Sequence, residues 1–155
     1  MIECKPLGIC SWDYTVTGED VTATVSFNSF GESGSLNING KRYSVEKKGA
    51  FDPEWTLRLG RDTIATASKE SVFTRSFDIQ YGSSNYSLKA ISAFSREMHL
   101  KGNGRNVIYS PKHAFTRRAQ IRGSWENKEV LLFGFYLAVL IWRRSANSGG
   151  AAAAG

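Results

Sequence analysis

The stretch EVLLFGFYLAVLIWRR, residues 129–144, decides the fold of this 155-residue chain. Residues 130–142 contain no charged side chain and no amide, and two arginines follow them directly. As a helix this run would be about 20 Å long, whereas the hydrocarbon core of a bilayer is roughly 30 Å thick. A helix that is apolar on every side must be enclosed on every side. The length favours a helix buried in the protein itself, at about residues 126–142, and leaves a membrane anchor or a partner-bound helix as alternatives.

The residues within and around this stretch also suit a buried helix. Glu126 and Glu129 precede the apolar run and the two arginines follow it, which complements the dipole of a helix over these residues. Gly134 and Ala138 are four positions apart, so a neighbouring strand could approach closely on that face. The tail SANSGGAAAAG, residues 145–155, has low complexity, and we expect it to be disordered.

Phenylalanines mark a repeat through the rest of the chain. Five of them are separated by intervals of 21, 22, 21 and 21 residues, namely Phe30, Phe51, Phe73, Phe94 and Phe115. Each precedes a run in which apolar and polar residues alternate, as in SFDIQYG at 76–82. Such alternation is typical of a strand with one buried face, and turn signals such as Asn39-Gly40 follow the runs. A second alternating run comes after each turn, so each unit is predicted to be a β-hairpin.

The hairpins together predict a barrel. Five of them span residues 10–109 and a last strand is expected near 117–122, which gives eleven or twelve antiparallel strands depending on the N-terminus. A sheet of this size tends to close, because closure removes its exposed edges. Its own side chains cannot fill a barrel that wide, and the apolar helix has the length to do so. We therefore predict one domain over residues 1–144, an all-β closed antiparallel barrel of about 12 strands around a central hydrophobic C-terminal helix.

Composition bounds the function. The net charge of +6 favours anionic partners such as lipid headgroups or nucleic acid. The N-terminus has no apolar run typical of a signal peptide, and Cys4 and Cys10 match no metal-binding spacing. We expect a cytoplasmic protein with two free thiols, and we leave open whether it associates with membranes. His99 and His113 belong to no recognisable catalytic motif, and a Walker-type phosphate loop is lacking, so we expect no enzymatic activity, no cofactor and no metal.

Arginines at one position of the repeat are the best candidates for binding. Three of them come two residues after a repeat phenylalanine, and equivalent positions on successive hairpins should lie on one rim of the barrel. If the helix threads back through the barrel, the arginines at its end emerge near the same rim. The six arginines of this predicted basic rim are Arg75, Arg96, Arg117, Arg118, Arg143 and Arg144. They could bind lipid phosphates, or they could form structural corners, in which the phenylalanine plugs the barrel end and the arginine binds loop carbonyls.

The order of hairpins followed by EVLLFGFYLAVLIWRR resembles the tubby C-terminal-like fold. That fold is shared by the tubby domain, the plant LURP-one-related proteins and the phospholipid scramblases. The resemblance covers roughly residues 5–144 and implies a barrel threaded by the hydrophobic helix. It also implies phosphoinositide binding, as in the tubby domain. The chain has no acidic calcium segment and no run of cysteines, so the resemblance implies neither lipid translocation nor calcium dependence.

These observations favour a non-enzymatic binding module that docks to an anionic membrane surface or phospholipid headgroups through the basic rim. Two alternatives stay open: an adaptor for nucleic acid or acidic proteins, and a structural domain whose hydrophobic helix is a membrane anchor. Against nucleic acid, aromatic residues that could stack on bases, such as Tyr81 and Tyr86, fall on the inward phase of their strands. The oligomeric state and the identity of the ligand are open at this level.

Overall fold

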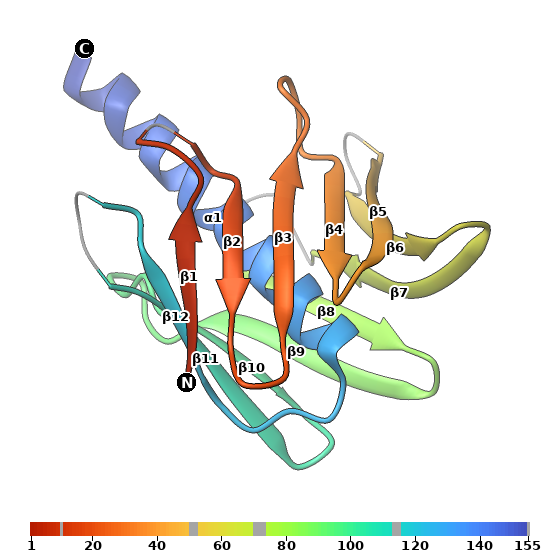
Figure 1. The fold of residues 1–155 in the computed structure, drawn as a ribbon. Helices are drawn as coiled ribbons and strands as arrows, with labels where there is room; N and C mark the ends of the chain where they lie inside the picture. The colour runs from red at the N-terminus through yellow and green to blue at the C-terminus, as the bar shows by residue number, and fades with distance from the viewer. Residues whose placement is uncertain (10, 50–52, 70–73, 113–115, 155) are drawn as a thin grey trace.

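A computed structural model describes residues 1–9, 11–49, 53–69, 74–112 and 116–154, and within them twelve strands surround one helix (Figure 1). The strands are β1 (Ile2–Pro6), β2 (Tyr14–Thr17), β3 (Thr22–Phe27), β4 (Gly34–Ile38), β5 (Lys41–Lys48), β6 (Glu54–Leu59), β7 (Asp62–Ser68), β8 (Ser76–Tyr81), β9 (Ser84–Ala90), β10 (Met98–Gly102), β11 (Arg105–Pro111) and β12 (Ala119–Gly123). The helix is α1 (Lys128–Ala154). Consecutive strands pair antiparallel, and β1 pairs with β12, which closes the barrel. The predicted fold class is confirmed.

The alternation of the strands places one set of side chains inside the barrel. In β8, Phe77 and Ile79 are buried, whereas Asp78 and Gln80 are exposed. The closing pair follows the same rule, because Ile2 lies opposite Ile121 and both are buried. Alternate residues of each strand therefore face the inside and the outside of the barrel, as the period of two in the sequence indicates.

Helix α1 fills the barrel. All side chains from Val130 to Trp142 are buried, in contact with the inner faces of the strands. The Tyr109 hydroxyl donates a 2.7 Å hydrogen bond to the carbonyl oxygen of Leu131. A Cβ atom at Gly134 would lie 2.4 Å from that hydroxyl, so only glycine allows the wall and the helix to approach this closely. The close approach predicted at Gly134 is confirmed.

The bounds of the helix differ from those predicted. It begins at Lys128 and continues to Ala154, through the tail that we expected to be disordered. Arg143 and Arg144 thus lie inside the helix and not in its last turn, so the dipole argument holds only for Glu129 in the first turn. Within the described residues, no helix has an apolar stretch long enough to cross a bilayer. The apolar run is buried inside the barrel, as the first of the three interpretations of this segment predicts.

The barrel has two unlike ends. At one, called the turn end here, two-residue turns such as Asn39-Gly40 and Asn103-Gly104 join the strands, with positive φ at all four residues. At the other, the loop end, the connections are 7–13, 28–33, 49–53, 69–75, 91–97 and 112–118. Helix α1 enters the barrel at the turn end and leaves it at the loop end (Figure 1). All six predicted arginines therefore lie at or near the loop end.

Candidate anion-binding end of the barrel

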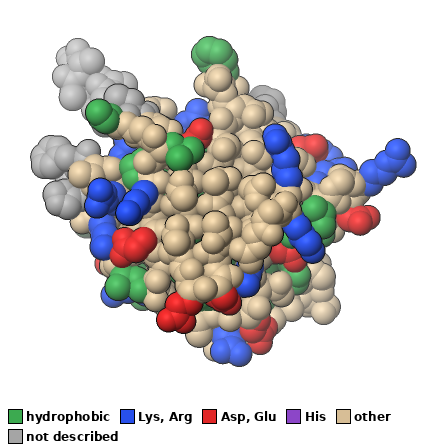
Figure 2. All heavy atoms as spheres, viewed as in Figure 1, with side chains coloured by type: hydrophobic (Ala, Val, Ile, Leu, Met, Phe, Trp, Pro, Cys, Tyr) green, Lys and Arg blue, Asp and Glu red, His purple; other side chains and the backbone are tan. Residues whose placement is uncertain are grey.

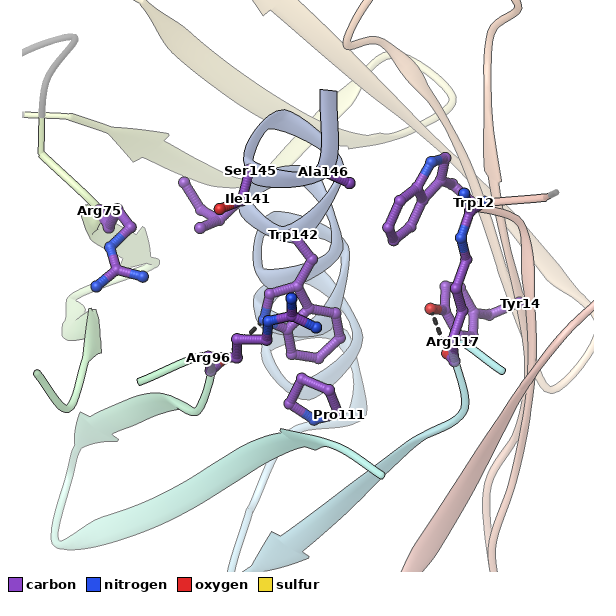
Figure 3. A pocket seen from close by; sticks show the side chains of 10 residues that line it. All are labelled: Trp12, Tyr14, Arg75, Arg96, Pro111, Arg117, Ile141, Trp142, Ser145 and Ala146. Atoms are coloured by element: carbon purple, nitrogen blue, oxygen red, sulfur yellow. Dashed lines mark hydrogen bonds between the residues drawn. The ribbon is translucent and has the colours of Figure 1, made fainter. Parts of the chain in front are cut away.

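A cavity of about 230 Å³ opens at the loop end, beside the exit of α1. Its walls carry Arg75, Arg96 and Arg117 together with the indole rings of Trp12 and Trp142 (Figure 3). These arginines are the ones that follow the repeat phenylalanines. The repeat predicted that they would share one rim, and the structure brings all three to one cavity.

Arg75 is a structural side chain. Its guanidinium donates hydrogen bonds to the carbonyl oxygens of Ser92 and Ala93, each at 2.7 Å, and of Ser95, at 3.0 Å. All three acceptors lie in the 91–97 loop, so Arg75 holds the next connection in place. Here the structural-corner interpretation of the repeat arginine is correct.

Arg117 is also held by its neighbours. Its guanidinium carbon lies 4.0 Å from the centre of the Trp12 ring, and one nitrogen donates to the carbonyl oxygen of Ser11 at 3.3 Å. Its φ is +54°, a left-handed conformation that costs a residue with a side chain about 1–2 kcal/mol. The Tyr14 hydroxyl donates to the Arg117 carbonyl oxygen at 2.6 Å and helps to hold this backbone. The charge of Arg117 faces the cavity but is fixed in position.

Arg96 and Arg118 are the arginines that remain for a ligand. Both are exposed, and neither guanidinium has a hydrogen bond or ion pair with any residue that the structure describes. The backbone of Arg96 is nonetheless anchored, because its carbonyl oxygen accepts a 2.7 Å hydrogen bond from the indole nitrogen of Trp142. An exposed guanidinium without a partner can form charge-assisted hydrogen bonds with an anion from solution.

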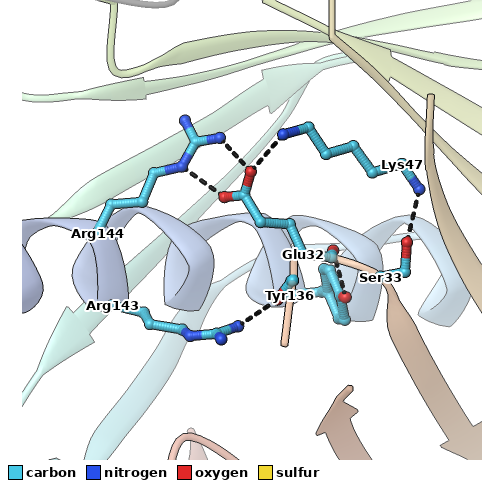
Figure 4. Close-up of polar contacts among 7 residues, drawn as sticks. Glu32, Ser33, Lys47, Tyr136, Arg143 and Arg144 are labelled. Atoms are coloured by element: carbon cyan, nitrogen blue, oxygen red, sulfur yellow. Dashed lines mark hydrogen bonds and ion pairs between the residues drawn. The ribbon is translucent and has the colours of Figure 1, made fainter. Parts of the chain in front are cut away.

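The other two predicted arginines lie elsewhere at this end. Arg144 forms a two-point ion pair with Glu32, with both nitrogen–oxygen distances at 2.5 Å (Figure 4). Arg143 donates to the carbonyl oxygen of Gly31 at 2.8 Å and lies over the ring of Phe27. Both hold the 28–33 loop against the helix. The six predicted arginines lie at one end of the barrel; Arg75, Arg96 and Arg117 line the cavity, whereas Arg143 and Arg144 bind the 28–33 loop.

Glu32, Arg144 and Lys47 form a group of paired charges at the loop end, called the Glu32 cluster here. Lys47 donates to the Glu32 carboxylate at 2.7 Å from the side opposite Arg144 (Figure 4). Burial opposes the charge of Glu32, but hydrogen bonds from Arg144 and Lys47 outweigh it and lower the pKa of this carboxyl below its ordinary value. The Tyr136 hydroxyl donates to the Glu32 carbonyl oxygen at 2.8 Å, so residues of α1 bind both the side chain and the backbone of Glu32.

Sequence reasoning missed Glu32, although the repeat contained the signal. Glu32 comes two residues after Phe30, the position that arginine holds in the last three units. It also missed Lys47 and Lys69, which continue the inward phase of their strands after Val45 and Ala67. A cation on the inward phase at a strand end would have been the clue to both lysines.

The repeat phenylalanines do not plug the barrel where the structure describes them. Phe30 and Phe94 are each 99% exposed, at the tips of the 28–33 and 91–97 loops. The interpretation of the phenylalanine as a plug is wrong for these two positions, because the helix already fills the space. Phe51, Phe73 and Phe115 lie outside the described residues.

The remaining candidates are the cysteines and the histidines. Cys4 is a free, buried thiol whose pKa burial raises, which makes it a poor nucleophile. His99 is half-buried on β10, and its Nε2 atom has no hydrogen-bond partner among the described residues. Cys10 and His113 lie outside the described residues.

The loop end thus presents exposed guanidinium groups, indole rings and a cavity, which together suit an anionic ligand. Comparisons with models of protein families, with characterised proteins and with solved structures found no match to this chain. The geometry and charge of the loop end are therefore the basis for a functional assignment.

Proposed function

We propose that this chain is a binding module that docks on an anionic membrane surface through the loop end of its barrel. The observation that carries the proposal is the placement of exposed apolar side chains. Leu7, Ile9, Phe30, Ile91 and Phe94 all lie in loops of this end, and Met1 is the only other exposed large apolar residue in the part of the chain that the structure describes. Apolar side chains in contact with water are a cost in free energy unless a partner or a membrane covers them.

The apolar residues occupy loop tips and not the barrel wall. Figure 2 shows hydrophobic side chains at the top of the 28–33 loop and on the 7–13 loop beside it. Ile9 is 95% exposed and Phe30 is 99% exposed, so both can enter a membrane interface without any change in the barrel. Fully burying one such side chain contributes about 1.5–3 kcal/mol.

The charges at the same end explain why the surface would be anionic. Arg96 and Arg118 have no partner among the described residues, and a cation near an anionic lipid surface contributes about 1 kcal/mol. Apolar insertion and electrostatic attraction are additive in binding at an interface. The loop tips would supply most of the affinity and the two arginines the preference for anionic lipid.

Binding to vesicles tests the proposal with matched variants. Arg96→Ala combined with Arg118→Ala should weaken binding to anionic vesicles by roughly 30-fold, because two cations of about 1 kcal/mol each are lost. Arg42→Ala combined with Arg61→Ala removes the same charge from exposed positions at the turn end and should leave binding nearly unchanged. Equal loss in the two double variants would mean that net charge alone drives binding, and would contradict docking through the loop end.

The apolar contribution needs a separate pair of variants. Phe30→Ser combined with Phe94→Ser should lower binding by more than about tenfold and should do so at high salt as well. Phe30→Leu combined with Phe94→Leu keeps both exposed side chains apolar and serves as the matched control. Tight, steeply salt-dependent binding to DNA by the wild type and by the phenylalanine variant alike would favour the nucleic-acid alternative instead.

A further inference from the structure

The cavity at the loop end has walls that the protein holds in place. Trp142 is only 8% exposed, and its indole nitrogen donates to the carbonyl oxygen of Arg96 at 2.7 Å (Figure 3). Its ring also packs edge to face against Phe135, with 6.2 Å between the ring centres. Trp12, the other indole of the cavity, lies under Arg117, with 4.0 Å between its ring centre and the guanidinium carbon. Walls that are fixed in this way bind a ligand without the cost of ordering side chains.

The cavity carries positive charge that no described acid balances. None of the described residues that line it is acidic. Two acids are next to lining residues in the sequence, and both have other partners. The carboxylate of Asp13 accepts a 2.9 Å hydrogen bond from the amide of Phe27. The carboxylate of Glu97 pairs with Arg122 at 3.6 Å. The guanidinium of Arg96 is therefore available to an anion from outside the protein.

A single free guanidinium selects the kind of anion. Arg75 is held by three loop carbonyls, and Arg117 is held by Trp12 and one loop carbonyl. Among the arginines of the cavity, Arg96 is the one without a partner in the described part of the chain. A planar guanidinium binds a planar carboxylate through two parallel hydrogen bonds, and the two charges balance. A doubly charged phosphate would leave water with one charge unpaired, which is costly.

The apolar walls and the volume select the rest of the ligand. Besides the two indole rings, Pro111 and Ile141 line the cavity, whose volume is about 230 Å³. An apolar cavity of about 150 Å³ holds a benzene molecule, so this one has room for one or two rings that carry a carboxylate. Aromatic rings are favoured over saturated rings beside an indole, because stacked and edge-to-face contacts add to the burial of apolar area.

We propose that this cavity binds a small aromatic carboxylate from solution. The ring of the ligand contacts the indoles of Trp12 and Trp142, and its carboxylate binds the guanidinium of Arg96. In sites for small molecules, apolar walls usually hold the body of the ligand and a few polar groups fix its orientation. Because the ligand is dissolved and binds in the cavity and not at the loop tips, this site is a function beyond membrane docking.

The four tryptophans of the chain make a selective test possible. Naphthoate would be added to the isotope-labelled full chain in buffer without vesicles, and the indole N–H signals would be followed by NMR. The signals of Trp12 and Trp142 should shift and saturate, with a Kd between about 10 µM and 1 mM. The signals of Trp55, which is buried on β6, and of Trp125, between β12 and α1, should not move. Equal shifts of all four signals, or no saturation up to about 10 mM, would overturn the proposal.

Three other probes test the chemical class of the ligand. Naphthalene methanol has nearly the same shape without the charge and should bind at least about tenfold more weakly than naphthoate, because the charge-assisted hydrogen bonds to Arg96 are lost. Decalin carboxylate keeps the charge but has saturated rings, and it should bind roughly threefold to tenfold more weakly. Inorganic phosphate alone should bind more weakly than naphthoate. Binding of any of the three as tight as that of naphthoate would overturn the assigned class.

Two pairs of variants locate the ligand. Arg96→Gln should weaken naphthoate binding by about tenfold or more, and the backbone carbonyl that holds Trp142 is kept. Arg61→Gln removes the same charge from an exposed position at the turn end and should leave binding unchanged. Ala146→Phe places a ring at the cavity wall and should abolish binding, whereas Asn147→Phe adds the same ring at the next, exposed position of α1 and should not. Equal affinities within either pair would place the ligand outside the cavity and contradict the proposal.

Discussion

The two ends of this barrel are made by the same hairpins and have opposite character. At the turn end the connections are mostly two residues long, and ion pairs such as Arg105–Glu126 and Lys128–Asp20 join neighbouring segments. At the loop end the connections are longer, large apolar side chains are exposed, and cations outnumber their described partners. The tight turns at one end fix the register of the strands. The loops at the other end are therefore free to vary in sequence and to contact another surface.

The two ends differ because a short turn restricts the backbone conformation of its residues more than a long loop does. A two-residue turn of this kind needs positive φ at both central positions, which limits its sequence to residues such as Asn and Gly. A longer loop has no such requirement, so its tip can carry phenylalanine or isoleucine as well as polar residues. Substitutions at the two ends should therefore differ in kind, and the helix that joins the ends should matter to both.

Loss of a helix side chain should have the largest effect, because it removes the shared support of the two ends. Leu137 is fully buried in the barrel. Leu137→Ala should lower the free energy of unfolding by about 2–5 kcal/mol, as deletion of a buried leucine usually does. Urea denaturation would measure this, with Ser145→Ala at an exposed position of the same helix as the control. A loss below about 1 kcal/mol would mean that the helix is not the core.

Removal of the Glu32 charge should come next and should act at the loop end. Glu32→Gln breaks the ion pairs with Arg144 and Lys47 and should cost about 1–3 kcal/mol. The more exposed pair of Glu46 and Arg58 is the matched control, and Glu46→Gln should cost less than about 1 kcal/mol.

The effect of Glu32 should depend on pH with a defined sign. Its pKa is lowered in the folded state, so the stability that it contributes is present above the unfolded-state pKa and is lost as the pH falls through the folded-state pKa. The difference between wild type and Glu32→Gln should be largest near neutral pH and should disappear in acid. A difference that stays constant down to acidic pH would show that the charge is not its source.

Gly104 at the turn end should be more sensitive to substitution than Gly8 at the loop end. Gly104 has a φ of +68°, whereas Gly8 in the 7–13 loop is not in the left-handed region. Gly104→Ala should cost about 1 kcal/mol through backbone strain alone, because nothing crowds the added Cβ atom. Gly8→Ala should be neutral or slightly stabilising. Thermal unfolding would compare the two variants, and equal effects would remove the distinction between the ends.

Substitution of a loop-end phenylalanine should have the smallest effect on stability. Phe94→Ser should change the free energy of unfolding by less than about 0.5 kcal/mol, because the side chain is almost fully exposed. Phe77→Ala, at an inward position of the barrel, should cost about 3–5 kcal/mol by contrast. Chemical denaturation of both variants checks this directly, and a large loss from Phe94→Ser would show that this tip packs against something in the folded protein.

Much of the fold could be predicted from the sequence, because the features that specify it are local. The alternation in SFDIQYG at 76–82 defines an inward and an outward face within one strand, and Asn39-Gly40 fixes a turn by backbone conformation alone. The apolar run at 130–142 is too short to span a bilayer and has no polar face, so it must lie inside something. The end of the helix escaped prediction, because the low complexity of the tail was taken to indicate disorder although its alanines favour a helix.

The candidate site could be predicted only in part. The repeat placed Arg75, Arg96 and Arg117 at one end, because equivalent positions of successive hairpins meet at one rim. It could not show that Arg75 and Arg117 are held by loop carbonyls and Trp12 while Arg96 is not. Those contacts depend on how loops pack across the barrel mouth.

The strands, the turns, the buried helix and the end of the barrel at which the cations gather follow from the sequence alone. Each of these follows from periodicity or from the preferences of a few adjacent residues. Which cations are paired depends instead on the tertiary structure. Glu32 meets Arg144 across 112 residues of sequence, and Lys47 reaches the same carboxylate from β5. Such contacts arise when the closed sheet and the helix bring distant residues together, and no local pattern encodes them.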